Sequence, residues 1–242
     1  MRMLWFARRC ALEMLRDKVN IFFGLGFPLG VMLLLTAIQA NVPVSLFELP
    51  FLTPGSGVFG LSFVSLVSAT LISRDRASYF MSRLLASPLT PGDFILGYTL
   101  PMLPLSVLQT LVCYAAAMAL GMKWTPNILA AAAAALPAMV FFIAVGLLCG
   151  TIFTDKQVGG VCGALLTNLT AFLSGTWFDV KLAGGVFESI AGALPFIHAV
   201  NAARAALSGD WSGIMPELWW VIGWASAMCA AAVWCFGKKM RV

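Results

Sequence analysis

Long apolar runs, separated by short polar segments, dominate this chain. A bilayer core of roughly 30 Å needs about 20 apolar residues in a helix that crosses it. Six runs approach that length: residues 20–40, 57–72, 94–120, 128–153, 158–177 and 218–236. The pattern predicts an all-α integral membrane protein with six transmembrane helices, folded as a single domain over residues 1–242.

The first 18 residues have a different pattern, with apolar and charged residues on opposite faces of one helix. The apolar face carries Leu4, Trp5, Ala11, Leu12 and Leu15, and the other face carries Arg2, Arg9, Glu13 and Arg16. Such a helix lies in the membrane interface. We therefore expect residues 1–18 to form an amphipathic elbow before the first span, the alternative being that they only cap that span.

A second amphipathic segment, residues 73–91, connects the second and third apolar runs. Its apolar stripe is Ala77, Phe80, Met81, Leu84 and Leu85, and polar side chains lie elsewhere. Ser87-Pro88 and Thr90-Pro91 end the helix, because a residue before proline is disfavoured in the α region. The segment predicts a short helix with one face on the membrane domain and one open to a partner, although an ordinary interfacial helix would look the same.

Residues 179–210, between the fifth and sixth runs, are too polar to span a membrane and too apolar for a free loop. A re-entrant helical hairpin satisfies both facts, since irregular backbone at membrane depth must be buried or line a cavity. Its ionisable residues Glu188, His198 and Arg204 are candidates for a gate. The alternative is that they lie at the headgroup level and stay in contact with water.

Polar residues inside the predicted spans are few. Gln39, Gln109 and Asn168 are candidates for lining a translocation path, because amides facing lipid are costly. Hydrogen bonds between helices are the alternative role. Glycines spaced four apart, such as Gly146 and Gly150, indicate close helix packing. No acidic residue lies centrally in a predicted span, which argues against a carrier coupled to protons or sodium.

Composition and charge agree with a membrane location. Hydrophobic residues make up 61% of the chain and charged residues 10%, against about half and a quarter in soluble domains. With a cytoplasmic N-terminus, twelve Lys and Arg fall on the inner side and three on the outer side, as the positive-inside rule expects. Both termini are therefore predicted to be cytoplasmic. Membrane lipid accounts for the net charge of +5, so no nucleic-acid partner is expected.

Motifs for catalysis are missing from the sequence. It has one histidine, no His-Glu-x-x-His pair and no Gly-x-Ser-x-Gly turn. Gly237-Lys238 is followed by Lys239 and lacks the rest of a phosphate-binding loop. We expect a protein that is not itself an enzyme, that binds no cofactor or metal, and whose six cysteines are packing residues.

Two stretches resemble the signature of type 2 ABC-transporter permeases. The first has Arg74-Asp75-Arg76, then Leu84-Leu85-Ala86-Ser87-Pro88-Leu89, then Ile95-Leu96-Gly97; the second has Leu194, Pro195, Arg204 and Gly209. Members often have Glu-Arg where this chain has Asp75-Arg76, a change that keeps both charges. Together with the elbow and six spans, the resemblance covers the whole chain.

The resemblance implies the permease subunit of an ATP-driven exporter in the bacterial plasma (inner) membrane. It implies an ABC ATPase partner with two nucleotide-binding domains, which holds ATP and Mg, and a second copy of this permease or a related one. The coupling helix would seat in the ATPase through Arg74, Asp75, Arg76, Phe80, Arg83, Ser87 and Pro88. The hairpin would lie on the outer side, and the cargo would be a drug, antibiotic, lipid or lipid-linked glycan. A passive channel or a structural membrane scaffold is the alternative.

Overall fold

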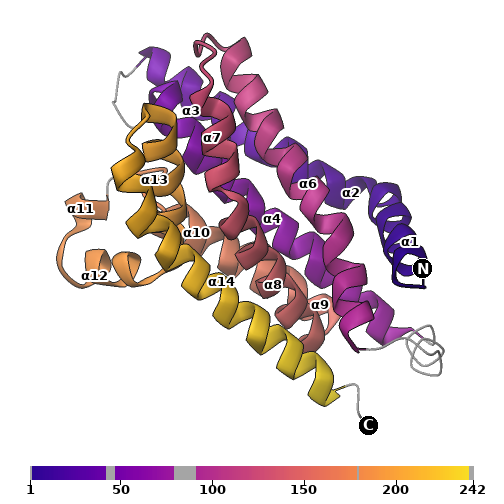
Figure 1. Cartoon of the computed structure of the whole chain (residues 1–242). Coiled ribbons are helices and arrows are strands. Elements are labelled where there is room, and N and C mark those ends of the chain that lie inside the picture. Colours follow the sequence, from indigo (N-terminus) through magenta and orange to yellow (C-terminus); the bar gives the residue numbers. More distant parts are fainter. Residues whose placement is uncertain (1, 42–46, 79–90, 179, 240–242) are drawn as a thin grey trace.

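The computed structural model of the chain describes residues 2–41, 47–78, 91–178 and 180–239, and this part contains helices and no strands. The helices run side by side as one bundle (Figure 1). Five are long and apolar enough to cross a membrane, or six if one bent pair counts as a span. The five are Lys18–Asn41, Leu49–Ala77, Gly92–Ala119, Asn127–Ile152 and Trp211–Lys239. The predicted all-α integral membrane fold is confirmed.

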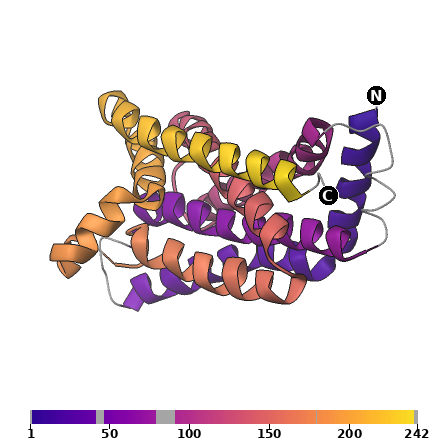
Figure 2. The ribbon, with the colours of Figure 1, turned by 90° about the horizontal axis from the view of Figure 1, so that it is seen from below.

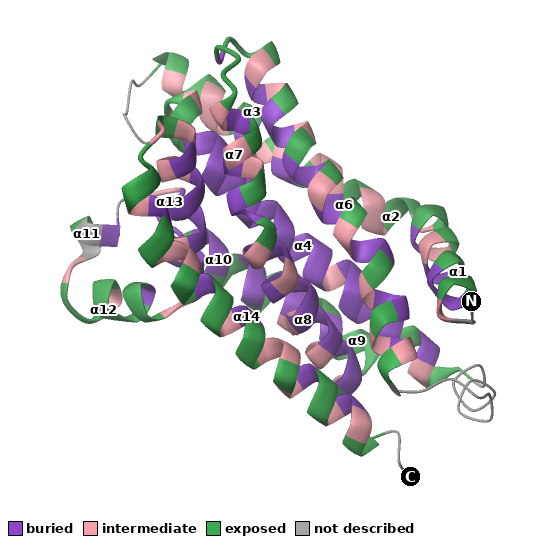
Figure 3. Ribbon diagram, in the orientation of Figure 1, coloured by how far each residue is buried: buried purple, intermediate pink, exposed green. Residues whose placement is uncertain are grey.

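Helix α4 (Leu49–Ala77) is the centre of the bundle. Its apolar stretch is 94% buried, against 17% for the first and last spans, and Figure 3 shows the same contrast between α4 and α14 (Trp211–Lys239). Small residues make this position possible. A Cβ on Gly146 of α8 (Leu136–Ile152) would lie 2.5 Å from the Ser65 carbonyl oxygen of α4. Glycine is needed there for the two backbones to approach, as its spacing predicted.

The remaining spans pack around α4. The first span is α2 (Lys18–Ile21), η1 (Phe22–Gly26) and α3 (Phe27–Asn41) in continuous succession. The third span belongs to α6 (Pro91–Ala119), and α7 (Asn127–Ala134) leads into α8. These elements and α14 correspond to five of the six predicted runs.

The predicted span over residues 158–177 is less apolar than the other five. Here the chain forms α9 (Asp155–Val158), η3 (Gly159–Leu166) and α10 (Thr167–Leu173), which pack along α4. This segment is not among the five helices long and apolar enough to cross. The charged residues of α9 and the polar Asn168 in α10 dilute its apolar character.

Helix α1 (Arg2–Arg16) lies across the ends of the long helices, as Figure 2 shows for the indigo segment. An elbow helix is therefore present, and it packs on the bundle through residues that the sequence analysis did not single out. Phe6, Cys10 and Met14 are buried against the bundle, whereas the predicted apolar face with Trp5 and Leu12 is exposed. The Phe6 ring packs edge-on against two rings of α6.

The predicted hairpin over residues 179–210 is a bent pair of helices. After α11 (Val180–Ala183), α12 (Gly185–Ala193) and α13 (Pro195–Ser208) meet at 74°. Helix α13 packs on α14, α7 and α4, while most of α12 is exposed. Gly209 ends α13 with a positive φ of 81°, which a residue with a side chain rarely adopts. We call this the hairpin end of the bundle, and the opposite end, with α1, the elbow end.

Candidate functional site

The last turn of α4 carries the charged residues that the sequence assigns to a coupling helix. Helix α4 continues through Ala77, so Arg74, Asp75 and Arg76 belong to it and not to a separate helix beginning at residue 73. The Ser78 hydroxyl donates to the Asp75 carbonyl oxygen at 2.8 Å and ends the helix. The other predicted coupling residues, Phe80, Arg83, Ser87 and Pro88, lie outside the described residues, so their predicted role stays a prediction.

Asp75 is buried and is hydrogen-bonded from two different helices. Both terminal nitrogens of Arg9 on α1 donate to its two carboxylate oxygens, one of them at 2.7 Å. The Tyr98 hydroxyl of α6 donates to it at 2.8 Å. Arg9 also pairs with Glu13 one turn further along α1. We call Arg9, Glu13, Asp75 and Tyr98 the elbow cluster. A bidentate pair between a guanidinium and a carboxylate is among the strongest hydrogen-bonded interactions in proteins.

Titration of groups on α1 reflects this environment. Partial burial alone would lower the pKa of Arg9, but the hydrogen bond and the charge of Asp75 outweigh it and raise that pKa above its ordinary value. Burial raises the pKa of Glu13. Burial also raises the pKa of the Cys10 thiol to about 12, so this thiol stays protonated near neutral pH. Arg9 is therefore permanently charged and Cys10 is a packing residue, as the sequence predicts.

Arg74 makes exposed ion pairs beside the cluster. Its Nη1 lies 2.8 Å from Asp17, just before α2, and its Nε lies 3.5 Å from Asp155 at the start of α9. Asp17 also caps α2 by accepting from the backbone of Asn20 at 3.1 Å. Slight burial would raise the pKa of Asp17, but the hydrogen bonds from Asn20 and Arg74 lower it. Three segments are linked here by contacts open to water.

Two further cations satisfy the last carbonyls of α8. Arg76 donates to the Gly150 carbonyl oxygen at 2.8 Å, and Lys239 of α14 donates to Thr151 and Ile152 at 3.1 and 3.2 Å. The final carbonyls of a helix lack intrahelical partners and attract positive charge. Arg76 and Lys239 therefore tie the ends of α4, α8 and α14 together.

The predicted motor contacts thus separate into two groups. Asp75 is 3% exposed and its carboxylate is occupied within the chain. Arg76 is half-buried and caps α8. Arg74 remains half-exposed, with 52% of its side chain accessible. Within this chain Asp75 holds the elbow helix to two spans. Its contact with a motor stays a prediction.

The candidate path residues inside the spans lie on three different helices, α3, α6 and α10. Gln109 of α6 is buried against Gly60 of α4, where a Cβ would lie 1.8 Å from its amide nitrogen, and it donates to the Cys113 sulfur at 3.4 Å. Asn168 is exposed and donates to the Ala164 carbonyl at 2.9 Å within its own helical segment. Gln39 lies far along α3. For Gln109, helix packing is the role that its contacts support.

The candidate gate residues occupy three places at the hairpin end. Glu188 is exposed on α12. His198 lies between the Glu217 carboxylate and the Gly192 carbonyl oxygen. Arg204 donates to the carbonyl oxygens of Phe51 and Gly175 at 3.1 and 3.0 Å.

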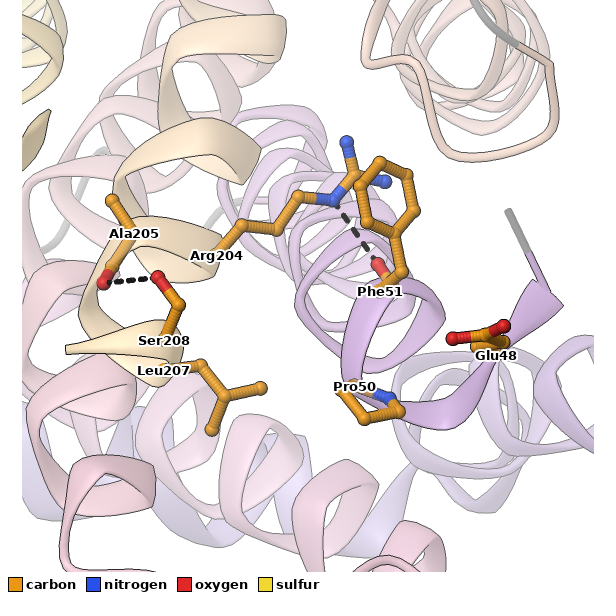
Figure 4. Close-up of a pocket in the computed structure, with 7 residues that line it drawn as sticks. All are labelled: Glu48, Pro50, Phe51, Arg204, Ala205, Leu207 and Ser208. Carbon is orange, nitrogen blue, oxygen red and sulfur yellow. Dashed lines mark hydrogen bonds between the residues drawn. The ribbon is translucent and has the colours of Figure 1, made fainter. Parts of the chain in front are cut away.

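The Arg204 guanidinium also lies 3.5 Å from the centre of the Phe51 ring. A hollow of about 440 Å³ opens between α13 and the first turn of α4, and Figure 4 shows Arg204 reaching across to Phe51. Its lining residues are Glu48, Pro50, Phe51, Arg204, Ala205, Leu207 and Ser208. Arg204 therefore connects the hairpin to the central helix.

Sequence reasoning missed the partners of these residues. The sequence pattern placed Arg9 on the charged face of the elbow, and it did not identify Tyr98 or Glu217 as candidate site residues. A phenol inside a predicted span is a usable signal, because a buried hydroxyl needs a hydrogen-bond partner. Within the described residues, His, Cys, Asp and Glu form no group of three or more that could hold a metal ion.

Comparison with known proteins identifies the family. The family model described as ABC-2 type transporter matches residues 2–208, a range that contains the elbow cluster and the hairpin helices. A search among curated proteins finds no match. The family comprises multi-pass membrane components of ABC transporters, in agreement with the apolar spans. Since the match covers most of the chain, this protein belongs to the ABC-2 type transporter family and is a permease component of an ABC transporter.

Proposed function

We propose that this chain is the transmembrane subunit of an ATP-driven exporter and forms the path for an amphiphilic or lipid-like cargo: a drug, antibiotic, lipid or lipid-linked glycan. The family implies an ABC ATPase as partner in general. That partner would hold ATP and Mg and supply two nucleotide-binding domains. The observation that carries the proposal is the elbow cluster, which connects three helices at one end of the bundle.

The elbow cluster supports coupling through the connectivity of the chain. Residues 79–90 join the end of α4 to the start of α6, and Asp75 and Tyr98 lie on those two helices near the join. A force applied between the two helices acts on both directly, and it reaches α1 through Arg9. Because a buried charge pair resists separation, α1, α4 and α6 would move as one unit.

Exposed apolar faces support assembly with a second permease. Phe22 on η1, Leu34 on α3, and Leu165 and Phe172 near α10 are exposed large side chains. Lipid or another apolar helix must cover such faces. A second copy, or a related permease, would enclose a path lined by aromatic and aliphatic side chains, which suits an amphiphile.

The distribution of Lys and Arg suggests how the chain is oriented in the membrane. The elbow end carries cations from α1, the last turn of α4 and the last turn of α14. By the positive-inside rule this end would face the cytoplasm, and both termini with it. The hairpin would then lie on the outer side of a bacterial inner membrane.

The test is reconstitution of the full chain with its co-purifying ATPase, followed by ATP hydrolysis and export measurements. Arg9→Gln should leave hydrolysis in place and lower export per ATP roughly tenfold, a change that a loss of about 1.4 kcal/mol of coupling produces. Arg16→Gln, at an exposed position on the same helix, is the matched control. Export without nucleotide, or a permease that never co-purifies with an ATPase, would favour the channel or scaffold instead.

A further inference from the structure

The corner between α12 and α13 is held to α14 by hydrogen bonds to two successive main-chain carbonyls. Nε1 of Trp220 and Nε1 of Trp224 both donate to Ala193, at 3.3 and 3.1 Å. The Nε2 atom of His198 lies 2.8 Å from the Gly192 carbonyl oxygen. We call Gly192 and Ala193 the hairpin corner. The last carbonyls of a helix need partners from outside it, and here α13 and α14 supply them.

The other ring nitrogen of His198 faces a carboxylate. Nδ1 pairs with Glu217 of α14, one turn before Trp220, whose ring centre lies 5.4 Å from the imidazole. The side chains of His198 and Glu217 are 21% and 26% exposed, so both are partly withdrawn from water. His198 is the single histidine in the chain. The imidazole therefore links α12, α13 and α14 at one point.

Both neighbours of the ring are hydrogen-bond acceptors, which determines how many protons the arrangement needs. A neutral imidazole has one N–H, a carbonyl oxygen only accepts, and an ionised carboxylate only accepts. A neutral ring beside ionised Glu217 can satisfy one neighbour and leaves the other facing a lone pair. One additional proton, on the ring or on the carboxyl group, satisfies both. The observed contacts of His198 therefore require a proton shared by the pair.

Few other charged side chains lie near enough to influence the protonation of His198 and Glu217. Among the elements packed against α13, α7, α8 and α10 contain no charged residue, and the charged residues of α4 lie in its last turn at the elbow end. Helix α12 contributes Glu188, which is exposed. Helix α14 contributes Glu217 and, at its far end, Lys238 and Lys239. Arg204, later on α13, is engaged with α4 and Gly175. Glu217 is thus the charged side chain that contacts the ring.

We propose that His198 and Glu217 are a proton-dependent positioning pair for the hairpin corner. With the shared proton the corner is held against α14. Without it, either Gly192 or Glu217 loses its donor, the corner is held to α14 by Trp220 and Trp224 alone, and the equilibrium shifts toward a position of α12 farther from α14. Arg204 holds α13 to α4 by bonds that need no titration, so the movement is confined to α12 and the corner. If the proposed export function holds, pH at the hairpin end sets how firmly the exit is closed.

The first measurement is the protonation of the ring in the full chain in lipid nanodiscs. Since there is one histidine, ¹⁵N-histidine labelling gives one pair of ring signals in solid-state NMR. We expect Nδ1 and Nε2 to be hydrogen-bonded with the extra proton present, and the ring of Glu217→Gln to lose its proton at lower pH than the wild type. Identical titrations in both proteins would overturn the proposal.

The second measurement is the position of α12. Spin labels attached through p-acetylphenylalanine at the exposed positions Ser189 and Met215 report the distance between α12 and α14. Loss of a hydrogen bond to a charged group changes an equilibrium by roughly ten- to a hundredfold. As the pair loses its proton, we expect the population with a longer distance between the two labels to increase, relative to the population with the shorter distance, by about that factor.

Matched variants separate proton dependence from a merely structural role. In Glu217→Gln, the introduced amide can donate to Nδ1 while Nε2–H donates to Gly192, so the short distance should persist at every pH. His198→Ala should show the longer distance at every pH. Glu188→Gln, which changes an exposed carboxylate on α12, should keep the wild-type profile.

Two results contradict the positioning pair: a wild-type pH profile in Glu217→Gln, or a short distance retained in His198→Ala. Neither labelling experiment needs nucleotide, ATPase or cargo. A proton-dependent corner in a protein that does not export would therefore remove the proposed function and leave this inference intact.

Discussion

The two ends of this bundle are held together by different kinds of bond. At the elbow end, charged side chains of separate helices bind one another or cap helix ends, and the buried carboxylate of Asp75 has donors from α1 and α6. At the hairpin end, side chains bind backbone carbonyls instead: His198, Trp220 and Trp224 bind the end of the mostly exposed α12. Arg204 binds the carbonyls of Phe51 on α4 and of Gly175. The first arrangement joins helices into one unit, and the second holds a segment that can leave its site while its neighbours stay folded.

The largest effect is expected from breaking the elbow cluster. Asp75→Ala removes the buried partner of Arg9, whose side chain is 34% exposed and keeps Glu13, so we expect a cost of about 3 kcal/mol, near the upper value for hydrogen bonds to charged groups. We expect the free energy of unfolding in detergent to fall by that order. Tyr98→Phe, which removes one donor and keeps the ring, should cost only about 1 kcal/mol. Equal losses in the two variants would mean that the Arg9–Asp75 pair stabilises the fold no more than the single hydrogen bond from Tyr98 does.

Helices α4 and α8 pack closely against each other along the bundle, between its two ends. Gly150→Ala places a Cβ 2.6 Å from the Ala69 carbonyl oxygen, so one backbone must shift. Overpacking of this kind costs about 1–3 kcal/mol. Thermal unfolding should show it, with Gly223→Ala on α14 as the control because its Cβ meets nothing within 4 Å. A stabilised Gly150→Ala variant would show that the close approach of α4 and α8 is not rigid.

Arg204 tests whether the hairpin end tolerates change better than the elbow end. Arg204→Lys keeps the charge but loses the planar fork that reaches both Phe51 and Gly175. We expect a loss of about 1–2 kcal/mol, seen as faster hydrogen exchange in α13 with the elbow end unchanged. Faster exchange in α1 as well would show that the two ends are not independent.

The smallest effect is expected for Arg74, which belongs to the elbow end but is exposed. Its pairs with Asp17 and Asp155 are open to water and salt, and such pairs contribute about 0.2–1 kcal/mol. Arg74→Gln should therefore change the unfolding free energy little, and added salt should remove the difference. If its loss matched that of Asp75→Ala, burial would not be what distinguishes the cluster.

Hydropathy was sufficient to predict most of the fold. Five spans, the elbow and the hairpin follow from the lengths of apolar runs and from mixed segments too polar to span and too apolar to be loops. The run at 158–177 is less apolar than the other spans, because its helix starts with charged residues and contains Asn168. Its helices nevertheless extend along α4 from Asp155, which pairs with Arg74 at the elbow end, toward Gly175, which Arg204 binds at the hairpin end. The site was less predictable. Arg9 and Asp75 are 66 residues apart, and their meeting depends on the rotation of two helices about their axes, which no run of hydropathy specifies.

The length of α4 has a consequence for the surrounding bilayer. It has 29 residues, as do α6 and α14, and at 1.5 Å per residue each measures roughly 43 Å. To fit entirely within about 30 Å of hydrocarbon, such a helix would need a tilt of roughly 45°, beyond the usual range of 0–40°. Part of each helix must therefore project into the lipid headgroup layers. Bilayer thickness and headgroup charge would then act on the two ends of the bundle, near Asp75 at one end and near Arg204 at the other.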